Sequence, residues 1–298
     1  MRKFLYLLSL VLLISLAMIS CEKAKTTETS ENNNVVNETI ATNKNEVKTE
    51  DEQLVDNTSE ETVETSTKNI EYITVTPEEV KIPILMYHSI SDADPNNSLL
   101  VPTAMFEEQM AWLEQNDFTA MSMDEVLEAM ETGVVPKRPV VITFDDGYSD
   151  NYTSAFPSLK NHGLKATFFV ITDGVDDGYY MSSDMLKEMQ AAGMSIENHT
   201  ANHLELNSLS RDAAYDSIKR GQDYLRDVIG SDGNYLCYPV GRYNDETIEI
   251  QKELGIKAAT TTNGGIATLS NGVHELNRVR IAPMSIENFA EIFSDYIY

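Results

Sequence analysis

Short apolar, β-branched-rich runs alternate with longer amphipathic stretches along the chain from Tyr72 onward. Runs of this length predict β-strands, and the amphipathic stretches between them predict helices. The predicted strands are residues 82–87, 140–144, 166–171, 194–197, 235–238 and 257–261.

The predicted helices lie between these strands. Ser122 and Glu125 have the spacing of a capping box at the start of one helix, Gly255 is a typical stop after another, and His162 at a third helix end is interpreted as structural. The helices are residues 106–115, one that begins at Ser122, 151–161, 183–192, 212–229, 245–254 and 286–296. Repeated strand-then-helix order predicts parallel strands with helices outside, either as a closed barrel or as an open sheet. In both architectures, functional residues gather at the carboxyl ends of the strands.

The first residues have the three-part pattern of an export signal. Arg2 and Lys3 precede an apolar run, residues 4–19, which is followed by a small residue and Cys21. The block AMISC resembles a bacterial lipoprotein signal, in which the cysteine is lipidated and becomes the mature N-terminus. A membrane span is the alternative, but the run is short for one and polar, acidic residues follow it. We therefore predict a lipoprotein signal peptide in residues 1–20, export, and a lipid anchor on the outer face of the bacterial cell membrane.

Residues 21–71 have the composition of a disordered acidic tether. Residues 22–71 contain no aromatic residue and are dominated by Thr, Glu, Asn, Ser and Lys, so they cannot bury enough apolar surface to offset their ordering entropy. The chain has two cysteines, Cys21 and Cys237, so lipidation of the first leaves no intrachain disulfide. We expect a single catalytic domain in residues 72–298, stabilised by its core alone.

The net charge of −26 limits the kinds of partner. Acidic residues outnumber basic ones in the predicted tether and in the predicted domain alike. Such a surface repels nucleic acid and other anionic polymers, whereas neutral or amine-bearing partners suit it. We therefore expect no nucleic-acid partner. Acidic surfaces often serve solubility only, so the charge excludes partners more than it identifies one.

The motif TFDDGY places Asp145 and Asp146 at the carboxyl end of a predicted strand. Adjacent side chains there point in different directions, so one carboxylate can bind a metal ion while its neighbour accepts a proton. Asp-Gly is also a strong turn signal, so the motif by itself leaves a plain turn open.

Three histidines follow other predicted strands. His199 and His203, in IENHTANH, are four residues apart, close enough in a helical turn to share one ion, and imidazole with carboxylate suits zinc or a similar metal. His88 follows the first strand, in PILMYHSI. An isolated pair of this spacing is more often a surface pair, and a lone histidine at a strand end is usually structural. Together with the two aspartates, however, these strand ends provide the ligands, base and acid of a metal-assisted hydrolase.

TFDDGY followed by HTANH, with KATFFV between them, resembles the first two motifs of the polysaccharide deacetylases, carbohydrate esterase family 4. The resemblance covers residues 82–298 and implies an irregular (β/α) barrel. It also implies that Asp145 is the catalytic base. Asp146, His199 and His203 would then bind one divalent metal, with zinc preferred over cobalt or nickel.

The third family motif is altered in this chain. CYPVGRYN keeps Pro239 and Gly241, but Cys237 stands where the family has an arginine and Val240 where it has an aromatic residue. By resemblance, the Pro239–Gly241 loop contacts the substrate or the developing oxyanion, and we expect Tyr148 to line the site with it.

Two family roles lack a residue in the usual place. For the arginine that orients the base we select Arg278, with Arg280 and Arg242 as alternatives. The family's usual histidine near the C-terminus is matched poorly by His274 in GVHELNRVRI. A subgroup that includes biofilm-polysaccharide deacetylases carries this histidine on the first strand as MYH, and the present sequence resembles that subgroup. The acid role is therefore assigned to His88.

These features predict metal-dependent hydrolysis of N-acetyl groups on an extracellular glycan, an N-acetylglucosamine polymer or peptidoglycan. One alternative is an O-acetyl esterase that acts on a glycan such as xylan, because the same site cleaves esters. The other is a glycan-binding lipoprotein without activity, which the altered third motif favours. A binding protein has no need of a water-activating base beside a metal, which favours the enzyme. We expect a monomer whose partners are the glycan and, through Cys21, the membrane.

Overall fold

The computed structural model of the protein describes residues 70–294. The predicted signal peptide, Cys21 and nearly all of the predicted tether lie outside these residues. Within residues 70–294, no helix has both the length and the apolar composition needed to cross a bilayer. The first strand, β1 (Tyr72–Thr74), pairs antiparallel with β6 (Val134–Pro136) in a small separate sheet.

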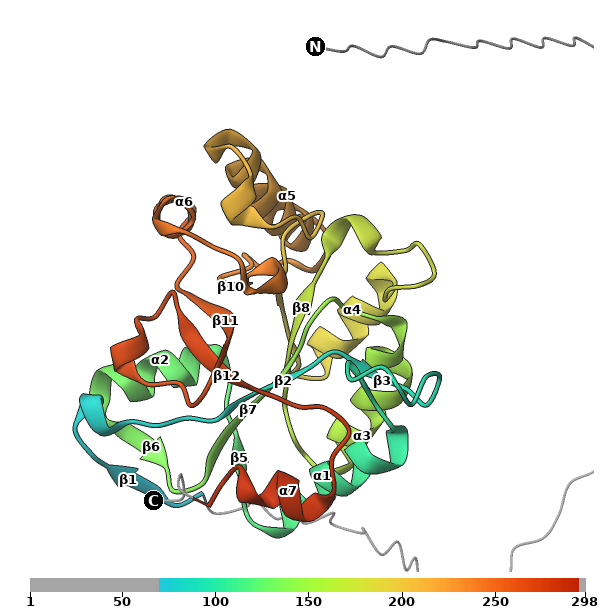
Figure 1. Cartoon of the computed structure of the whole chain (residues 1–298), viewed down its shortest axis with the longest axis vertical. Coiled ribbons are helices and arrows are strands. Elements are labelled where there is room, and N and C mark those ends of the chain that lie inside the picture. The colour runs from blue at the N-terminus through green and yellow to red at the C-terminus, as the bar shows by residue number, and fades with distance from the viewer. Residues whose placement is uncertain (1–69, 295–298) are drawn as a thin grey trace, which may run out of the picture. The chain divides into compact units, whose positions relative to one another are not determined.

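Seven parallel strands close into a barrel (Figure 1). In chain order they are β2 (Ile84–Tyr87), β7 (Pro139–Phe144), β8 (Thr167–Val170), β9 (Ser195–Asn198), β10 (Tyr235–Cys237), β11 (Ala258–Gly264) and β12 (Leu276–Arg280). Around the barrel the order is β2, β12, β11, β10, β9, β8 and β7, and pairing of β7 with β2 closes the ring. A short strand, β5 (Thr119–Ala120), adds to β7 from outside. The structure therefore confirms the barrel and excludes the open sheet.

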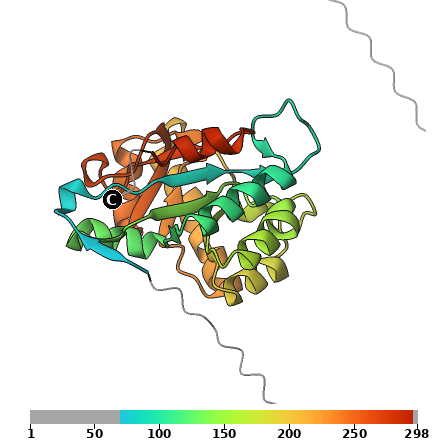
Figure 2. The same cartoon turned by 90° about the horizontal axis from the view of Figure 1, so that it is seen from below.

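Helices surround the barrel. They are α1 (Thr103–Gln115), α2 (Met123–Thr132), α3 (Phe156–Asn161), α4 (Ser183–Ala191), α5 (Arg211–Ile229), α6 (Asp245–Glu253) and α7 (Ile286–Glu291). Figure 2 shows β2 and β7 side by side, with α1, α3 and α4 gathered along one side of the domain. The predicted capping box is confirmed, because Ser122 Oγ accepts from the Glu125 amide at 3.3 Å and the Glu125 carboxylate accepts from the Ser122 amide at 2.6 Å.

Among the barrel strands and the α-helices, three elements differ from the sequence prediction. The predicted helix of residues 151–161 begins as a π-helical turn, Asn151–Ala155, before α3. The predicted helix of residues 286–296 is α-helical only to Glu291, and residues 295–298 lie outside the described part. Strand β12 was not predicted, because its sequence LNRVR mixes polar and charged residues with two apolar ones.

The alternation of side chains along each strand determines what faces the barrel interior. In β7, Val140, Ile142 and Phe144 belong to the core cluster that packs against α1 and α3, whereas Val141 belongs to a different cluster on the opposite face. Thr143 continues the row of Val141, and the next position in that row, just beyond the strand, is Asp145.

On three more strands, too, a polar or ionisable residue follows an interior-facing residue by two positions. Tyr235 and Leu276 pack in the cluster of Val141. Two residues further along their strands come Cys237 and Arg278, and on β9 His199 follows Glu197 in the same manner. Side chains fill the interior of a small barrel in layers, so these rows end in one polar layer at the carboxyl ends of the strands.

An aromatic cluster holds the end of β7 from outside the barrel. The Phe144 ring lies 4.7 Å from that of Phe168, 5.4 Å from that of Tyr87 and 5.7 Å from that of Phe106, measured between ring centroids. All four side chains are fully buried. Burial of so much aromatic surface fixes the strand end from which the two aspartates extend.

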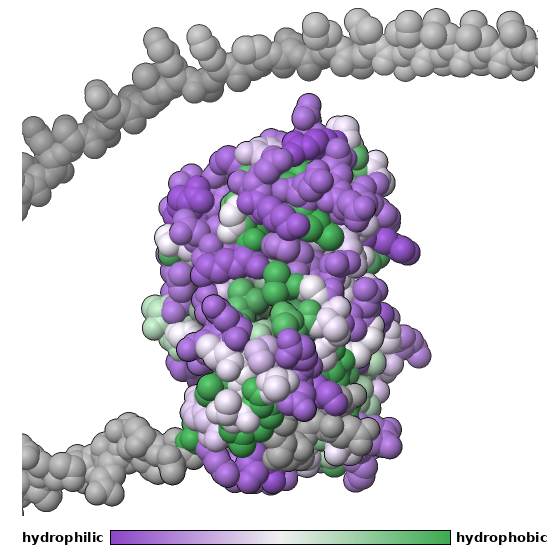
Figure 3. Space-filling model, turned by 90° about the vertical axis from the view of Figure 1, so that its left-hand side faces the viewer, coloured by the Kyte–Doolittle hydropathy of each residue, from purple (hydrophilic) through white to green (hydrophobic). Residues whose placement is uncertain are grey.

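The surface carries both hydrophilic and hydrophobic areas. Figure 3 shows one face, on which hydrophilic side chains predominate toward the top and hydrophobic ones gather in smaller areas in the middle and lower parts. The large hydrophobic side chains exposed in residues 70–294 are Ile70, Tyr72, Val134, Tyr179, Leu204 and Val240. The first three belong to, or directly precede, the β1–β6 pair, and the last three belong to loops after barrel strands.

Candidate active site

Asp145 and Arg278 form a buried ion pair joined by two parallel hydrogen bonds. Arg278 Nη1 donates to Asp145 Oδ1 and Nη2 to Oδ2, each at 2.7 Å. The guanidinium also donates to the Thr261 carbonyl at 2.8 Å and to Thr143 Oγ1 at 3.1 Å. Burial would raise the pKa of Asp145, but the charge and hydrogen bonds of Arg278 outweigh it and hold that pKa well below its usual range. Asp145 is therefore an oriented carboxylate that stays ionised.

The structure separates the three candidate arginines. Arg278 has no exposed surface and lies against Asp145. Arg280 is exposed and donates to Ser98 Oγ at 3.1 Å, and Arg242 lies beyond the third-motif loop, where its amide donates to the Pro239 carbonyl. The guanidinium thus reaches the aspartate from β12 and not from β10, whose corresponding residue is Cys237. Arg278 Nη2 lies 3.1 Å from Cys237 Sγ, so the smaller cysteine side chain leaves room for it.

His88 lies near the other side of Asp145. Its Nε2 is 3.9 Å from Asp145 Oδ2, and its side chain is 15 % exposed. Burial lowers the pKa of His88, while the charges of Asp145 and Asp146 raise it, and burial prevails. His274 lies elsewhere, with Nδ1 at 3.2 Å from Gln251 Oε1 on α6. Of these two histidines, therefore, it is His88 that can exchange protons with the aspartate.

The segment after β2 is tied to the turn that follows TFDDGY. Asn151 Nδ2 donates to the His88 carbonyl at 2.7 Å. Asp150 accepts from the Ser89 hydroxyl at 2.6 Å and from the Ile90 amide at 3.0 Å. These contacts fix the backbone of His88 relative to the aspartate pair. The sequence analysis did not single out Asp150 and Asn151, although they closely follow the aspartate motif.

Asp146, His199 and His203 converge on one point. The Nε2 atoms of His199 and His203 lie 3.3 and 3.4 Å from Asp146 Oδ1, and all three atoms lie within 4.8 Å of one another. Two ligands at about 2.0–2.2 Å from a tetrahedral zinc ion are themselves about 3.3–3.6 Å apart. Both carboxylate–imidazole distances match this spacing. Two imidazoles and one carboxylate therefore fit a divalent cation with an open position for water or substrate.

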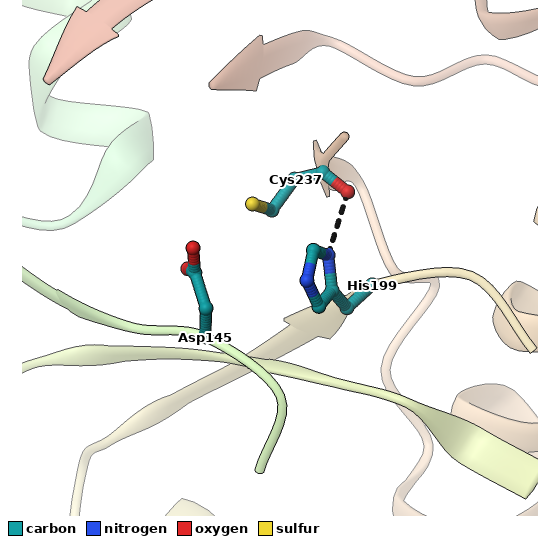
Figure 4. Close-up of side chains that lie close together, drawn as sticks. All are labelled: Asp145, His199 and Cys237. Atoms are coloured by element: carbon teal, nitrogen blue, oxygen red, sulfur yellow. Dashed lines mark hydrogen bonds between the residues drawn. The ribbon is translucent and has the colours of Figure 1, made fainter. Parts of the chain in front are cut away.

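A backbone contact orients the first imidazole. His199 Nδ1 lies 2.8 Å from the Cys237 carbonyl oxygen (Figure 4) and donates to it, because a carbonyl can only accept. In the neutral ring this leaves the Nε2 lone pair directed at Asp146. Burial lowers the pKa of His203, which favours the neutral imidazole that a metal requires.

The HTANH turn is anchored to α5 by an asparagine. Asn198 Oδ1 accepts from the Thr200 amide at 2.8 Å, and its Nδ2 donates to the Ile218 carbonyl at 2.9 Å. Gly221 allows this contact, because a Cβ there would lie 2.2 Å from Asn198 Oδ1. Thr200 Oγ1 in turn accepts from the His203 amide at 3.0 Å. The signal that the sequence analysis missed is this buried asparagine at the end of β9, directly before the first histidine.

The prediction that the two histidines lie on a helical turn is wrong. His199 and His203 lie in a loop, where Thr200 has φ of 66° and His203 φ of 54°. Asp146 has φ of 72°. Left-handed backbone positions, and not a helical turn, therefore direct two of the three side chains at the common point.

A second group of possible ligands exists among the described residues. Asp145, His199 and Cys237 also offer atoms within 4.8 Å of one another (Figure 4). Both Asp145 oxygens accept from Arg278, however, and the same guanidinium contacts Cys237 Sγ. A cation here would lie against a buried positive charge. The group of Asp146 is therefore the better cation site.

The third-motif loop lies in an unusual backbone conformation. Val240 has φ of 55° and is 52 % exposed, and Gly241 has φ of 68°. A Cβ on Gly241 would lie 2.0 Å from Thr262 Oγ1, so no larger residue fits there. Pro239 has no N–H, and the Gly241 amide already donates to the Tyr238 carbonyl at 2.8 Å. The amide that this loop can offer to an oxyanion is therefore that of Val240.

Tyr148 lies close to the predicted metal ligands. It follows Asp146 by two residues and is half-buried. Burial, and then the charge of Asp146, raise the pKa of Tyr148, so its hydroxyl stays protonated. Of the predicted site residues, only Cys21 lies outside the described part of the chain. The remaining roles stay predictions, although the structure brings their side chains together.

Comparisons with known proteins agree with this geometry. A family model described as polysaccharide deacetylase matches residues 132–259. A Bacillus subtilis (strain 168) protein that carries the name of a polysaccharide deacetylase, YxkH, is 38% identical over 209 residues, which are 70% of this chain and 74% of that protein. The poly-β-1,6-N-acetyl-D-glucosamine N-deacetylase of Staphylococcus epidermidis is 27% identical over 230 residues, 68% of this chain and 80% of that protein. The solved structure of the Streptococcus pyogenes deacetylase PplD, in complex with acetate, superposes with a TM-score of 0.69 at 38% identity and covers 72% of this chain and 98% of that one.

Proposed function

Because the chain belongs to the polysaccharide deacetylase family, carbohydrate esterase family 4, we propose that it removes N-acetyl groups from an extracellular glycan that contains N-acetylglucosamine. One observation carries the proposal. Two adjacent aspartates have different partners, since Asp145 is bound by a guanidinium while Asp146 faces two imidazoles. Such a division suits a base beside a metal ligand.

Asp146, His199 and His203 would hold the divalent ion, and zinc suits this ligand set best. When bound, the ion supplies Lewis-acid polarisation of the acetamide carbonyl and makes a water molecule more acidic. Asp145 accepts a proton from the attacking water. Its oxygens accept from Arg278, but each carboxylate oxygen has a further lone pair.

Proton transfer then links Asp145 to the leaving amine. A carboxylate with so low a pKa binds the proton weakly and passes it on. His88, 3.9 Å from Asp145 Oδ2, is the acceptor within reach after a small movement, and it delivers the proton to the nitrogen as the C–N bond breaks. The products are acetate and a free amine on the glycan. The proton matters because an unprotonated amide nitrogen leaves poorly.

The Val240 amide would stabilise the tetrahedral oxyanion. A preorganised donor aimed at the developing charge contributes about 3–4 kcal/mol to the transition state. The left-handed conformation of Val240 presents this amide. The side chain that replaces the family's aromatic residue is small, so the rim is more open here.

The remaining elements of the proposal concern location and partner. We propose that the protein is exported and anchored through lipidated Cys21, with residues 21–71 as a spacer and the domain acting as a monomer. The S. epidermidis relative is a poly-β-1,6-N-acetyl-D-glucosamine N-deacetylase. Its similarity supports a polymer of N-acetylglucosamine as the substrate of this chain.

Amine release tests the proposed function. The purified protein is incubated with N-acetylglucosamine oligomers of β-1,4 and β-1,6 linkage and, separately, with acetylated xylan. We expect free amine from at least one oligomer, loss of this activity with a chelator, and its return with zinc. Acetate from xylan without amine from any oligomer would identify an O-acetyl esterase. Oligomer binding without release of amine or acetate would identify a binding protein.

A further inference from the structure

Three tyrosines, Tyr148, Tyr179 and Tyr180, form a cluster beside the candidate active site that we call the tyrosine shelf. The rings of Tyr148 and Tyr180 are stacked with centroids 5.5 Å apart. The Tyr179 ring stands edge-on to them, at 5.4 and 5.1 Å. At 64 % exposure, Tyr179 is the most exposed of the large hydrophobic side chains in residues 70–294. Exposed aromatic surface next to a site is typical of a binding surface.

Hydrogen bonds hold the backbone of the shelf, although its outer ring is exposed. The Ser149 amide donates to the Tyr179 carbonyl at 3.1 Å, and the amides of Tyr179 and Tyr180 donate to Asp177 Oδ1 at 2.7 and 3.0 Å. The Tyr180 ring packs so closely on Gly174 that a Cβ there would lie 2.4 Å from it. A ligand that contacts the shelf therefore has little conformational freedom to remove.

The shelf adjoins Asp146. Tyr148 and Tyr180 also form an antiparallel β-bridge, and the Met181 amide donates to the Gly147 carbonyl at 2.9 Å, so the tyrosine loop is paired with the aspartate turn itself. A ligand on the shelf would therefore lie next to a group bound by Asp146.

We propose that the Tyr179 ring is a sugar-binding subsite, on which the pyranose next to the reacting N-acetyl unit stacks; this inference rests on the proposed deacetylase function. A pyranose has a face of C–H groups that packs on an aromatic ring and buries apolar surface. Asp176 and Asp177 lie in the same loop and disfavour an anionic sugar. The ligand is thus a neutral or partly deacetylated hexosamine oligomer, and a single sugar would not engage both positions.

Substitution of Tyr179 tests the subsite. The full chain is compared with its Tyr179→Ala and Tyr179→Phe variants on N-acetylglucosamine oligomers, with an aryl acetate as a small substrate that cannot reach the shelf. We expect Tyr179→Ala to raise KM for oligomers about tenfold, as loss of one aromatic contact implies. The ratio of kcat/KM for the oligomer to kcat/KM for the aryl acetate falls by the same factor, and Tyr179→Phe retains the wild-type KM and ratio. Tyr72→Ala, at a tyrosine of similar exposure on β1, is the matched control and leaves all values unchanged.

Three outcomes would overturn the subsite. They are an unchanged KM in Tyr179→Ala, an equal loss in Tyr179→Phe, or a loss on the aryl acetate as large as on the oligomers. Calorimetric affinity for the oligomer separates this inference from the proposed function. If the wild-type protein binds oligomers through Tyr179 but releases no amine, the subsite stands and the deacetylase assignment fails. If amine is released and affinity does not depend on Tyr179, the deacetylase assignment stands and the subsite fails.

Discussion

At the amino ends of the barrel strands, glycine takes the left-handed backbone position after a helix, whereas at the carboxyl ends other residues take it. The glycines that follow a helix and precede a barrel strand in this way are Gly163, Gly193, Gly230 and Gly255. The carboxyl-end positions are Asp146, Thr200, His203 and Val240, with φ between 54° and 72°. For an L-residue such a position costs roughly 1–2 kcal/mol.

The difference shows where the domain retains backbone strain. At the amino ends no side chain is needed, so glycine closes each turn without strain. At the carboxyl ends Asp146 and His203 face the candidate cation site, Thr200 accepts from the His203 amide, and Val240 presents its amide. Asp117 after α1, and Gly147 and Gly241 after β7 and β10, show that the division is not absolute. Strain of this kind clusters at functional sites, where the surroundings hold it in place.

The largest effect is expected when the site at the carboxyl ends of the strands loses the buried positive charge of Arg278. Arg278→Met leaves Asp145 buried without a cation, which costs about 3–5 kcal/mol of folding stability. Activity should fall at least about a hundredfold, because the base loses its orientation and because burial, no longer opposed by Arg278, raises the pKa of Asp145 and favours its protonated form. Thermal unfolding and turnover on N-acetylglucosamine oligomers measure the two effects.

Arg280→Met is the matched control on the same strand. Arg280 is exposed, and its hydrogen bond to Ser98 is a surface contact. It should change stability by less than about 0.5 kcal/mol. Equal behaviour of the two variants would show that the buried pair does not organise the site.

Two substitutions, one at each end of the barrel strands, should change folding stability by smaller amounts and in opposite directions. Val240→Gly removes a β-branched residue from the left-handed region and should raise stability by about 1 kcal/mol while activity falls. Gly255→Ala, after α6, should lower stability by about 1–2 kcal/mol and leave activity unchanged. Open space surrounds the added methyl group of the second variant, so only backbone strain acts.

Chemical denaturation and turnover of both variants provide the measurement. A gain in stability without loss of activity in Val240→Gly would show that the left-handed position serves no catalytic purpose. Loss of activity in Gly255→Ala would show that backbone positions at the amino ends of the strands also matter for function, against the division between the two ends.

The smallest expected effect is the pH dependence of folding stability that His162 contributes among the helices outside the barrel. His162 ends α3 and contacts Glu114 through Nδ1 at 2.7 Å and Glu107 through Nε2 at 2.9 Å. Burial lowers the pKa of His162, but the two glutamates outweigh it and raise that pKa above its ordinary value. A raised pKa in the folded state stabilises fully below about pH 6.5, the unfolded value, and this contribution is lost as pH rises through the folded value.

His162→Gln should therefore lower stability at pH 5.5 by up to about 1 kcal/mol and have little effect at pH 9. Melting temperatures across this range give the difference. His274→Gln is the control, because the nearest partner of His274 is the neutral Gln251. The same loss at both pH values would mean that His162 acts through packing and not through charge.

The fold was predictable where the pattern is local. Six of the seven barrel strands and all seven helices were anticipated within a few residues, because apolar runs and amphipathic stretches record burial directly. Strand β12 was missed for a physical reason. Arg278 is buried only because Asp145, far away in sequence, neutralises it, and no local pattern reveals such a partner.

The site was predictable in its residue types but not in its geometry. Asp145, Asp146 and the histidines stand in recognisable motifs, and the structure brings them together. The left-handed turns at Asp146 and His203, the anchoring role of Asn198 and the tyrosine shelf depend on contacts between distant segments. A single sequence does not contain these contacts in readable form.

The central claim is that two adjacent aspartates divide proton transfer from metal binding. The most direct test measures bound zinc and amine release in Asp145→Asn and Asp146→Asn side by side. We expect Asp145→Asn to keep the zinc content of the wild-type protein and lose nearly all activity, and Asp146→Asn to lose both. Near-normal activity in Asp145→Asn, or an equal loss of zinc in both variants, would contradict the account.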